Sequence, residues 1–479
     1  MAEPEFDLFI IGAGPTGYGT FLTATACGLK TALADKGLVG QDGANNATMK
    51  MIQPGSKYVR TDLEMVRDDA VDCGLLKTIG GKLLGRQRFI LPIFKNYGFP
   101  LNEPLVMGAY FDVYDRFSRI ALHPPHKMLS AEEVKKLEPS LADNIWGGVS
   151  FDEWVTNPLE LASACVNLGK QFGGVVMENS RVIGFRTEKT SDGLLIRSAI
   201  LQERSGVTEV RARYFANTAG AWAPQIVSMI VPKHSLKLRP TKGTSMVVNK
   251  RLTDHAVILF GSSGEYLALL PEGKTTLIGP TNFDVPPEVA QNPDLLKPEF
   301  FETEYLRLTA NRHLNPNFSI NRNEIIRTRC GLRPQLPHEG VNPYDIIHRF
   351  GNFDHDVDGI INLISAIGGK LSLWIRMSKE LTELICEKLD FPFEWRTPYV
   401  RLDGNCPTAG TVNLCTHSCS FPLDSYKKRR GLKSGRELEK AVYMTALGKR
   451  IKANLVLAKS ILKSLKNSEP DFAKKEARC

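Results

Sequence analysis

Three glycines near the amino terminus have the spacing of a phosphate-binding turn. The apolar run Leu8–Ile11 is typical of a buried parallel strand, and Gly12-x-Gly14-x-x-Gly17 follows it directly. In such a turn the first glycine permits a tight bend, the second lets a pyrophosphate approach the backbone, and the third lets the helix pack on the strand. We expect residues 18–29 to form that helix, with its N-terminal N–H groups facing the phosphates.

An acidic residue follows at the position where a ribose would lie. Residues 30–34 predict a second strand, and Asp35 ends it. A carboxylate at this point accepts hydrogen bonds from ribose hydroxyls. Because strand, glycines, helix, strand and acid occur in this order, the sequence predicts a dinucleotide-binding βαβ unit rather than an ordinary glycine-rich turn.

Two later stretches repeat this pattern of an apolar strand, a glycine turn and a helix. Residues 215–220 end in a glycine turn before a helix at 222–229. The strand 360–367 ends in Gly368-Gly369-Lys370 before a helix at 371–389. We therefore predict a discontinuous dinucleotide-binding domain of residues 1–75, 146–230 and 350–392. A substrate-binding domain of residues 76–145 and 231–349 is threaded through it, and residues 393–479 form a C-terminal loop and helical region.

The remaining elements follow from local patterns. Hydrophobic spacing, or a cap followed by a first-turn proline, predicts helices at 61–76, 131–137 (capped by Ser130), 157–169 and 298–314. Alternating or continuous apolar residues predict strands at 146–151, 174–177, 180–185, 194–202, 207–215, 244–248 and 267–279.

Composition places the chain among ordinary globular proteins. Its 479 residues are 42% hydrophobic and 24% charged, and we find no apolar run of transmembrane length and no signal-peptide pattern at the start. The nine cysteines are dispersed, which indicates reduced thiols in a cytoplasmic protein. The net charge of +9 fits an anionic substrate, nucleic acid or a membrane surface.

Much of the excess positive charge lies after residue 426. Residues 437–465 predict a helix with an apolar face and lysines opposite. Such a helix could lie on a membrane interface or pack on its own domain. We expect a cytoplasmic protein, and peripheral contact with the inner face of a membrane stays open.

Several motifs, taken in order, resemble the FAD-dependent glycerol-3-phosphate dehydrogenases, closest to the large subunit of the anaerobic type, a member of the DAO-like flavoprotein oxidoreductases. The resemblance covers roughly residues 5–390. It depends on the opening glycine turn and on the segments Gly43–Tyr58, Asn217–Ala223, Lys242–Val248, Leu277–Thr281, Thr328–Pro334 and Gly368–Leu371.

The resemblance implies an α/β fold (α+β overall). It has a Rossmann-like FAD-binding domain of the glutathione-reductase type, an inserted antiparallel-sheet substrate domain and a helical C-terminal region. The implied reaction oxidises C2 of sn-glycerol 3-phosphate to dihydroxyacetone phosphate, with hydride transfer to the flavin. The FAD-binding residues that it implies are Gly12, Gly14, Gly17, Asp35, Lys36, Thr48, Val182, Gly220, Gly368, Gly369 and Lys370.

A phosphorylated substrate needs fixed cations, and the fork of an arginine meets two phosphate oxygens at once. By position in the resemblance, Arg333 and Arg349 are the phosphate candidates, and Lys57 and Tyr58 complete the substrate-binding set. Arg333 and Lys370 are also catalytic candidates, because Lys370 ends a glycine turn beside the flavin ring. Either arginine could instead be an ion-paired scaffold residue.

The chain departs from the family pattern at several of these positions. Where the family has His-x-Gly-x-Arg-Tyr, this sequence has Gln53-Pro-Gly-Ser-Lys57-Tyr58, and a histidine expected after Lys242-Gly-Thr is Ser245. These changes leave the flavin site intact and put the exact substrate in doubt. They also leave no assigned general base, and His348 is the catalytic candidate in its place.

The C-terminal cysteines Cys406, Cys415 and Cys419, with His417, match neither a zinc nor an iron–sulfur spacing, so we expect no metal.

Two other functions stay open. One is a related flavoprotein that oxidises a 2-hydroxy acid or an amino acid. The other is a flavin-bearing protein that binds nucleic acid or a partner, which Arg333 and Lys370 argue against. The sequence leaves the electron acceptor open among a quinone, oxygen and an iron–sulfur partner.

Overall fold

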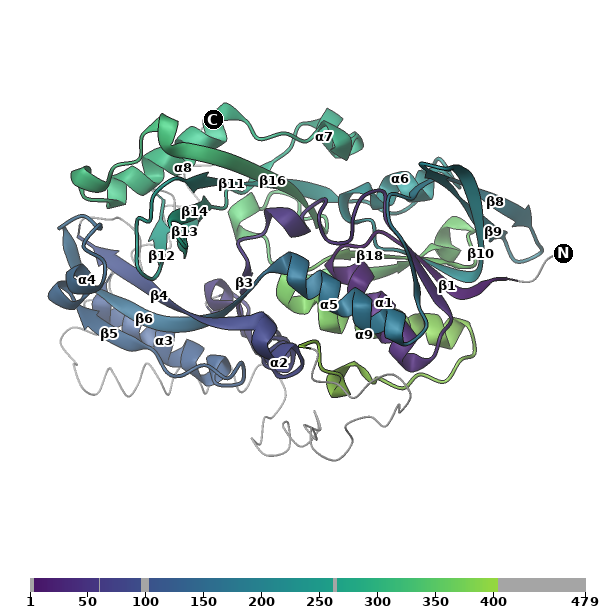
Figure 1. Ribbon diagram of the computed structural model, residues 1–479, viewed down its shortest axis with the longest axis horizontal. Helices are drawn as coiled ribbons and strands as arrows, with labels where there is room; N and C mark the ends of the chain where they lie inside the picture. Colours follow the sequence, from purple (N-terminus) through teal and green to yellow (C-terminus); the bar gives the residue numbers. More distant parts are fainter. Residues whose placement is uncertain (1–3, 60, 96–102, 262–264, 404–479) are drawn as a thin grey trace.

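The computed structural model describes residues 4–403, apart from residues 60, 96–102 and 262–264. Two β-sheets lie side by side and organise two domains (Figure 1). The first domain contains the three chain segments that end in glycine turns, and the second is built from segments inserted between them. This arrangement agrees with the predicted fold class.

The first sheet has the strand order β17-β18-β10-β1-β2-β7. All of these strands are parallel except β17, which runs antiparallel to β18. Their bounds are β1 Phe6–Ile11, β2 Thr31–Ala34, β7 Val175–Met177, β10 Gly206–Asn217, β17 Phe350–Asp354 and β18 Leu363–Gly368.

Both faces of this sheet are covered, which is why residues Leu8–Ile11 of β1 are all apolar. Leu8 and Ile10 belong to a core formed with the helices α1 Pro15–Cys27, α5 Pro158–Gln171 and α9 Trp374–Lys388. These three helices lie close together beside the first sheet (Figure 1). Phe9 and Ile11 face a core formed with β8 Arg181–Lys189, β9 Leu194–Glu203 and α6 Ala223–Ser228. Parallel strands that are buried on both faces have continuous apolar runs in their sequences.

The second sheet has the order β15-β11-β14-β13-β12-β4-β6-β3, with β16 beside β11 and β5 beside β6. It is antiparallel except for the pair β12–β4. Its strands are β3 Met51–Ile52, β4 Leu84–Phe94, β5 Lys127–Ser130, β6 Ile145–Thr156, β11 Arg239–Val248, β12 Ala256–Phe260, β13 Tyr266–Glu272, β14 Thr275–Gly279, β15 Phe283–Asp284 and β16 Ile325–Gln335. The accompanying helices are α2 Leu63–Gly80, α3 Pro104–Ser118, α4 Ala131–Leu137, α7 Pro287–Gln291 and α8 Phe300–His313.

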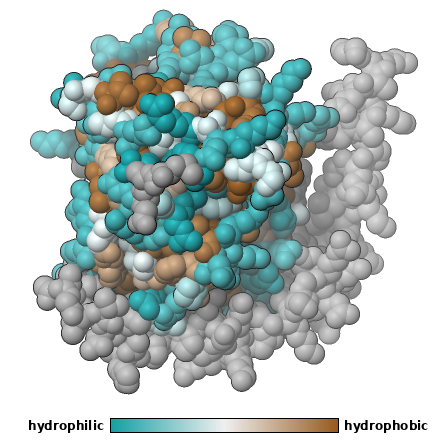
Figure 2. Space-filling model, turned by 90° about the vertical axis from the view of Figure 1, so that its right-hand side faces the viewer, coloured by the Kyte–Doolittle hydropathy of each residue, from teal (hydrophilic) through white to brown (hydrophobic). Residues whose placement is uncertain are grey.

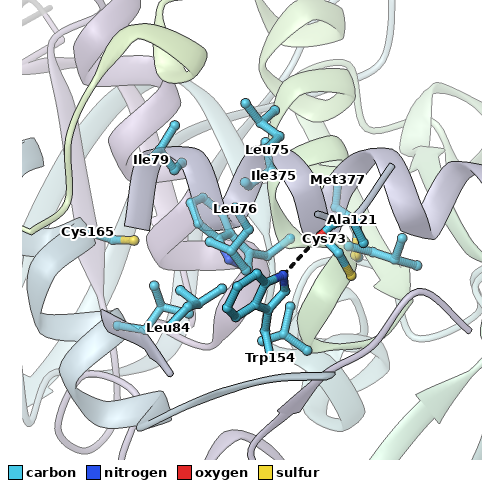
Figure 3. Close-up of a cluster of buried hydrophobic side chains, with 14 of the residues drawn as sticks. Cys73, Leu75, Leu76, Ile79, Leu84, Ala121, Trp154, Cys165, Ile375 and Met377 are labelled. Atoms are coloured by element: carbon cyan, nitrogen blue, oxygen red, sulfur yellow. Dashed lines mark hydrogen bonds between the residues drawn. The ribbon is translucent and has the colours of Figure 1, made fainter. Parts of the chain in front are cut away.

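A single hydrophobic core joins the two domains. Helix α2 lies between α9 of the first domain and β6 of the second. Cys73 and Leu76 of α2 pack near Ile375 of α9 and Trp154 of β6 (Figure 3). The Trp154 indole N–H donates to the Ala121 carbonyl at 2.7 Å, so the polar edge of this buried ring is satisfied.

Most of the predicted elements are confirmed. Helix α4 spans the predicted residues 131–137, and Ser130 with Glu133 forms a capping box at its start. Helix α5 starts at Pro158 behind the Asn157 cap.

Three predictions at this level are wrong or incomplete. Residues 146–156 were assigned to the dinucleotide-binding domain, but β6 pairs with β3 and β4 in the second sheet. The run 267–279 is a hairpin of β13 and β14, because Gly273 turns the chain with φ +60°. Strands β3, β4, β5, β12, β15, β16 and β17 and helices α3 and α7 were not predicted.

The predicted helix 437–465 and the cysteines Cys406, Cys415 and Cys419 lie outside the described residues. Among the residues that are described, no helix is long and apolar enough to cross a bilayer. Seen from the end that carries β8 and β9, polar and apolar side chains are interspersed on the surface (Figure 2). Ile183 and Val207 are among the exposed apolar residues of this end.

Candidate active site

A cavity of about 360 Å³ runs between the two domains. Its first-domain wall contains the turns after β1, β2, β10 and β18. Its second-domain wall contains residues of β13 and β16. One end reaches Asp35 and Lys36, and the other reaches Arg333 and Lys370. The carboxyl ends of parallel strands meet at this edge of the first sheet, where open α/β sheets bind their ligands.

The opening glycine turn has the geometry that its spacing predicts. Gly12 has φ +98°, and a Cβ there would lie 2.8 Å from the Ala219 Cα. A Cβ on Gly17 would lie 1.8 Å from the Gly12 carbonyl oxygen, so this glycine lets α1 pack on the turn without lining the cavity. In front of Gly14 a Cβ would meet nothing within 4 Å. Gly14 lines the cavity at the N-terminus of α1, so this open space is part of the cavity, and a pyrophosphate fits there.

Asp35 also lines the cavity and ties two loops together. Its carboxylate accepts a bond from the Ala13 N–H at 2.6 Å and another from the Gly37 N–H at 2.9 Å. Burial raises the pKa of this carboxyl, and these two bonds oppose the rise. The predicted bond to a ribose stays a prediction.

Lys36 belongs to a charged cluster at the same end. Its ammonium pairs with Asp294 at 2.5 Å and lies 3.8 Å from the centre of the Trp222 ring. The Trp222 indole N–H also donates to Asp294, at 2.9 Å. Arg181 pairs with the other oxygen of this carboxylate at 3.3 Å. Asp294 belongs to the second domain, so this cluster joins the two domains beside the cavity.

The other predicted FAD-binding residues are distributed along the cavity. Its lining residues include Thr48, Val182, Gly220, Gly368 and Gly369. Thr48 follows a short 3₁₀ helix at 45–47 rather than starting a helix.

Three cationic side chains converge at the far end of the cavity. Lys57, Arg333 and Lys370 come from three separate segments and all line it. Among the described residues, Lys370 is the only one of the three that forms an ion pair. Like charges brought together in this way give the cavity wall a positive potential that can attract an anion.

Arg333 of β16 is held by neutral oxygen atoms. Its guanidinium donates to the Asn282 side-chain oxygen at 2.8 Å and to the Thr281 carbonyl at 3.1 Å. Gly243 on the neighbouring strand makes room for it, because a Cβ there would lie 2.2 Å from the guanidinium. Its position is therefore fixed while its charge is not neutralised by a carboxylate.

Lys370 is positioned by helix α2. Its ammonium pairs with Asp69 at 2.6 Å and donates to the Gln53 carbonyl at 3.2 Å. Burial raises the pKa of the Asp69 carboxyl to about 6, although Lys370 opposes that rise. The glycines before Lys370 turn the chain with φ +92° and +76°, which directs this residue into the cavity wall.

Lys57 is the cation whose charge depends most on its surroundings. Its ammonium donates to the Tyr344 carbonyl at 3.4 Å and lies 4.9 Å from the centre of the Tyr58 ring. Burial, followed by the charges of Arg333 and Lys370, lowers the pKa of Lys57 to about 7. The side chain is therefore half protonated near neutral pH.

Tyr58 and His348 complete this end. The rings meet edge to face with centroids 6.3 Å apart, and Tyr58 is buried. Burial, and then the charges of Lys57 and Arg333, hold the pKa of His348 well below its usual range. Its Nε2 is buried and has no hydrogen-bond partner in the described part of the chain. This histidine is therefore a neutral imidazole beside the anion site.

Arg349 lies elsewhere. Its guanidinium pairs with Asp62 at 2.5 Å, and the side chain is 53% exposed. It does not line the cavity. Asp62 also caps helix α2 by accepting from the Met65 N–H. The structure thus places Arg349 in a scaffold ion pair and gives no support to its predicted role in phosphate binding.

The family model of the FAD dependent oxidoreductases (DAO) matches residues 7–384. The chain belongs to this family. It is 26% identical over 413 residues to the anaerobic glycerol-3-phosphate dehydrogenase subunit A1 of Haloferax volcanii. It is also 26% identical over 397 residues to the aerobic glycerol-3-phosphate dehydrogenase of Bacillus subtilis. The matches cover 83% and 81% of this chain but only 66% and 68% of those relatives.

The fold agrees with this membership. A solved glycerol-3-phosphate dehydrogenase from Bacillus halodurans in complex with FAD superposes with a TM-score of 0.66 at 21% identity. The superposition covers 93% of this chain and 76% of that one. The cofactor of this oxidoreductase is FAD, and the cavity fits it. The open space at Gly14 and the start of α1 suit the pyrophosphate. The cationic end with Lys370 suits the redox-active ring, whose reduced form is anionic.

Some residues of the flavoenzyme's site were not predicted. The sequence does contain a signal for Asp69 that we did not use. Asp69 shares a helical face with Val66 and Cys73, and an acidic residue on an apolar face needs a partner. Tyr266 and Asn282 gave no such signal. The hairpin and sheet pairing alone bring them to the cavity end. Among residues 4–403 as described, no three His, Cys, Asp or Glu side chains are grouped to hold a metal.

Proposed function

We propose that this oxidoreductase oxidises the C2 hydroxyl of sn-glycerol 3-phosphate to give dihydroxyacetone phosphate. The observation that carries the proposal is the convergence of Lys57, Arg333 and Lys370 at one end of the FAD cavity, where, in the described part of the chain, only Lys370 forms an ion pair, with Asp69. The names of the two curated relatives support the same substrate class. A small molecule with one phosphate dianion matches this charge and this space.

Arg333 is the phosphate anchor in this proposal. Its guanidinium is held in place by Asn282 and Thr281, so little side-chain entropy is lost when an anion binds. Its fork can donate two parallel hydrogen bonds to phosphate oxygens. Lys57 adds a second charge, and the Tyr58 ring shields it from water.

His348 is the proposed proton acceptor. Oxidation of an alcohol carbon requires that the hydroxyl proton leave, and a neutral imidazole with a free nitrogen can take it. Burial, and then the neighbouring cations, lower the pKa of His348 and make it a weak base. A bound phosphate dianion partly neutralises Lys57 and Arg333, which removes part of the cause of the low pKa. The substrate thus strengthens its own base.

When bound, FAD supplies the acceptor for the hydride equivalent that leaves C2. Lys370, held by Asp69, keeps a positive charge next to that end of the cavity. The buried Tyr58 narrows access for water there. Arg333 and Lys57 orient the substrate through its phosphate, which fixes the carbon to be oxidised.

Anaerobic mixing of the purified holoenzyme with glycerol 3-phosphate tests the proposal. We expect rapid loss of the visible flavin absorption, whereas glycerol without a phosphate causes slow loss or none. Loss of absorption with a 2-hydroxy acid or an amino acid, and none with glycerol 3-phosphate, would overturn the substrate assignment. Reoxidation by oxygen or by a water-soluble quinone would then distinguish an oxidase from a dehydrogenase.

Peripheral contact with a membrane is a separate proposal, based on the predicted amphipathic segment 437–465. Deletion of this segment should reduce co-sedimentation with anionic vesicles and leave anaerobic flavin reduction unchanged. Equal sedimentation of the deleted and complete chains would rule it out.

A further inference from the structure

A short segment of the second domain reaches across to the first domain at the Asp35 end of the FAD cavity. It contains α7 and a 3₁₀ helix at Pro293–Leu295, and we call residues 287–295 the strap. The Gln225 side chain of α6 donates to the Gln291 carbonyl of the strap at 2.7 Å. Figure 1 shows α7 next to α6, whereas α2, which belongs to the core shared by the two domains, lies toward the opposite edge of the view.

One carboxylate of the strap holds three parts of the cavity wall. Lys36 follows β2, Arg181 begins β8, and Trp222 lies in the turn after β10. All three residues line the cavity, and Asp294 does not. Each donates to the Asp294 carboxylate, Lys36 at 2.5 Å, Trp222 at 2.9 Å and Arg181 at 3.3 Å. The Asp294 N–H donates to the Asn292 side-chain oxygen at 3.3 Å, which fixes the turn that presents this carboxylate.

The Trp222 ring spans part of the wall beside Asp35. The Lys36 ammonium lies 3.8 Å from the ring centre, and a Cβ on Gly43 would lie 3.5 Å from the ring. The ring therefore bridges the turn after β10 and the loop that follows β2, and Gly43 lines the cavity as well. Because Asp294 holds the indole N–H, the strap also fixes the orientation of this ring.

The contacts of Asp294 are ionic and partly exposed to water. The exposed fractions are 27% for the Lys36 side chain, 41% for Asp294 and 53% for Arg181. Burial acts to raise the pKa of the Asp294 carboxyl, but the hydrogen bonds from Lys36 and Trp222 outweigh it and lower the pKa, so the carboxylate is charged at neutral pH. Ion pairs of this exposure are weak and are screened by salt. Breaking them costs far less than opening the apolar core that α2 shares with both domains.

We propose that the strap is a clasp that retains FAD, and that Asp294 is its positioning residue. While Asp294 holds Lys36, Trp222 and Arg181, three separate segments of the wall are kept together around the end of the cavity where a ribose is predicted to bind. The cofactor leaves only after these contacts break. Asp294 acts through the wall residues, since it does not line the cavity itself. The inference concerns the cofactor and is independent of the substrate proposed for the other end of the cavity.

The rate of FAD release from the complete holoenzyme tests the proposal. Wild type, Asp294→Asn and the control Asp284→Asn are diluted, and the free FAD that passes an ultrafiltration membrane is measured over time. Asp284 is a matched control, because it pairs with Arg239 within the second domain and its side chain is 52% exposed. At low salt, Asp294→Asn should release FAD roughly 3- to 10-fold faster than the wild type, because two partly exposed ion pairs are lost. Asp284→Asn should release it at the wild-type rate.

Salt gives a second measurement that uses the wild-type chain. At about 1 M salt the Debye length falls to about 3 Å, so the ion pairs of the clasp are screened in the wild type too. The ratio of the Asp294→Asn rate to the wild-type rate should therefore fall toward one.

Four outcomes would overturn the proposal. They are equal rates for Asp294→Asn and the wild type at low salt, an equal acceleration in Asp284→Asn, a ratio of rates that salt does not change, and FAD that none of the three proteins releases. These readouts do not depend on the substrate that the enzyme oxidises.

Discussion

The charge of Lys57 makes the pH dependence of substrate binding a sharp test of the site. Its pKa is lowered to about 7, so the amine loses its proton as the pH rises through that value. The substrate's phosphate gains its second charge as the pH rises through about 6, as for other phosphate monoesters. The dianion and protonated Lys57 therefore coexist best between about pH 6 and 7. We expect the tightest binding in that window.

The size of the alkaline loss follows from these values. Half of Lys57 is protonated at pH 7, so if only the protonated form bound the phosphate, the apparent Kd would rise ~5-fold from pH 7 to pH 8 and ~50-fold by pH 9, at ~1.4 kcal/mol for each tenfold. One hydrogen bond to a charged group contributes about 1.5–3 kcal/mol, which limits the total loss to roughly 10–150-fold. We therefore expect a rise of about fivefold between pH 7 and pH 8 and a plateau by about pH 9.

The variant Lys57→Arg should abolish this alkaline loss, because a guanidinium stays protonated throughout the range. Lys57→Gln should bind weakly at every pH. The assay is stopped-flow anaerobic flavin reduction at pH 6 to 9, with the apparent Kd taken from its dependence on glycerol 3-phosphate. Lys250→Arg is the control, because Lys250 pairs with Glu324 in the second domain. An alkaline limb in Lys57→Arg equal to that of the wild type would refute the reasoning, and so would a flat wild-type profile.

Three further predictions follow from the geometry. Gly14→Ala should fold normally and bind FAD more weakly, since its Cβ would occupy open space at the cavity wall. Gly17→Ala should lower the thermal unfolding midpoint, because its Cβ would lie 1.8 Å from a carbonyl oxygen. Equal midpoints for the two variants would contradict this. Arg333→Ala should raise the apparent Kd for glycerol 3-phosphate by roughly 10–150-fold. Arg349→Ala should leave it nearly unchanged, because this side chain does not line the cavity and pairs with Asp62 instead; the reverse order in the same titration would restore Arg349 as the anchor. Asp69→Asn should slow flavin reduction at saturating substrate with little change in apparent Kd, because it frees Lys370 and leaves Arg333 in place; an unchanged rate would show that Lys370 needs no partner.

The sequence by itself determined the parts of this protein that depend on local backbone geometry. The opening glycine turn, the strand before it and the Gly368-Gly369-Lys370 turn were all predicted, and the structure brings them to one cavity. Such turns need glycines at fixed spacings, because only glycine permits the close backbone approach or the positive φ seen at Gly12. The helix cap at Ser130 also depends on local sequence alone, and it was also predicted.

Only the tertiary structure decided which charged residues serve the cavity. Arg333 and Arg349 were both phosphate candidates by sequence. The pairing of β16 with β11 directs Arg333 inward, while the cap residue of α2 holds Arg349 at the surface. Asp69 and Tyr266 reach the site from a helix and a hairpin far apart in the chain. The lowered pKa of Lys57 likewise comes from burial and from charges on other segments. Contacts between distant segments depend on how whole elements pack, and no local pattern records that.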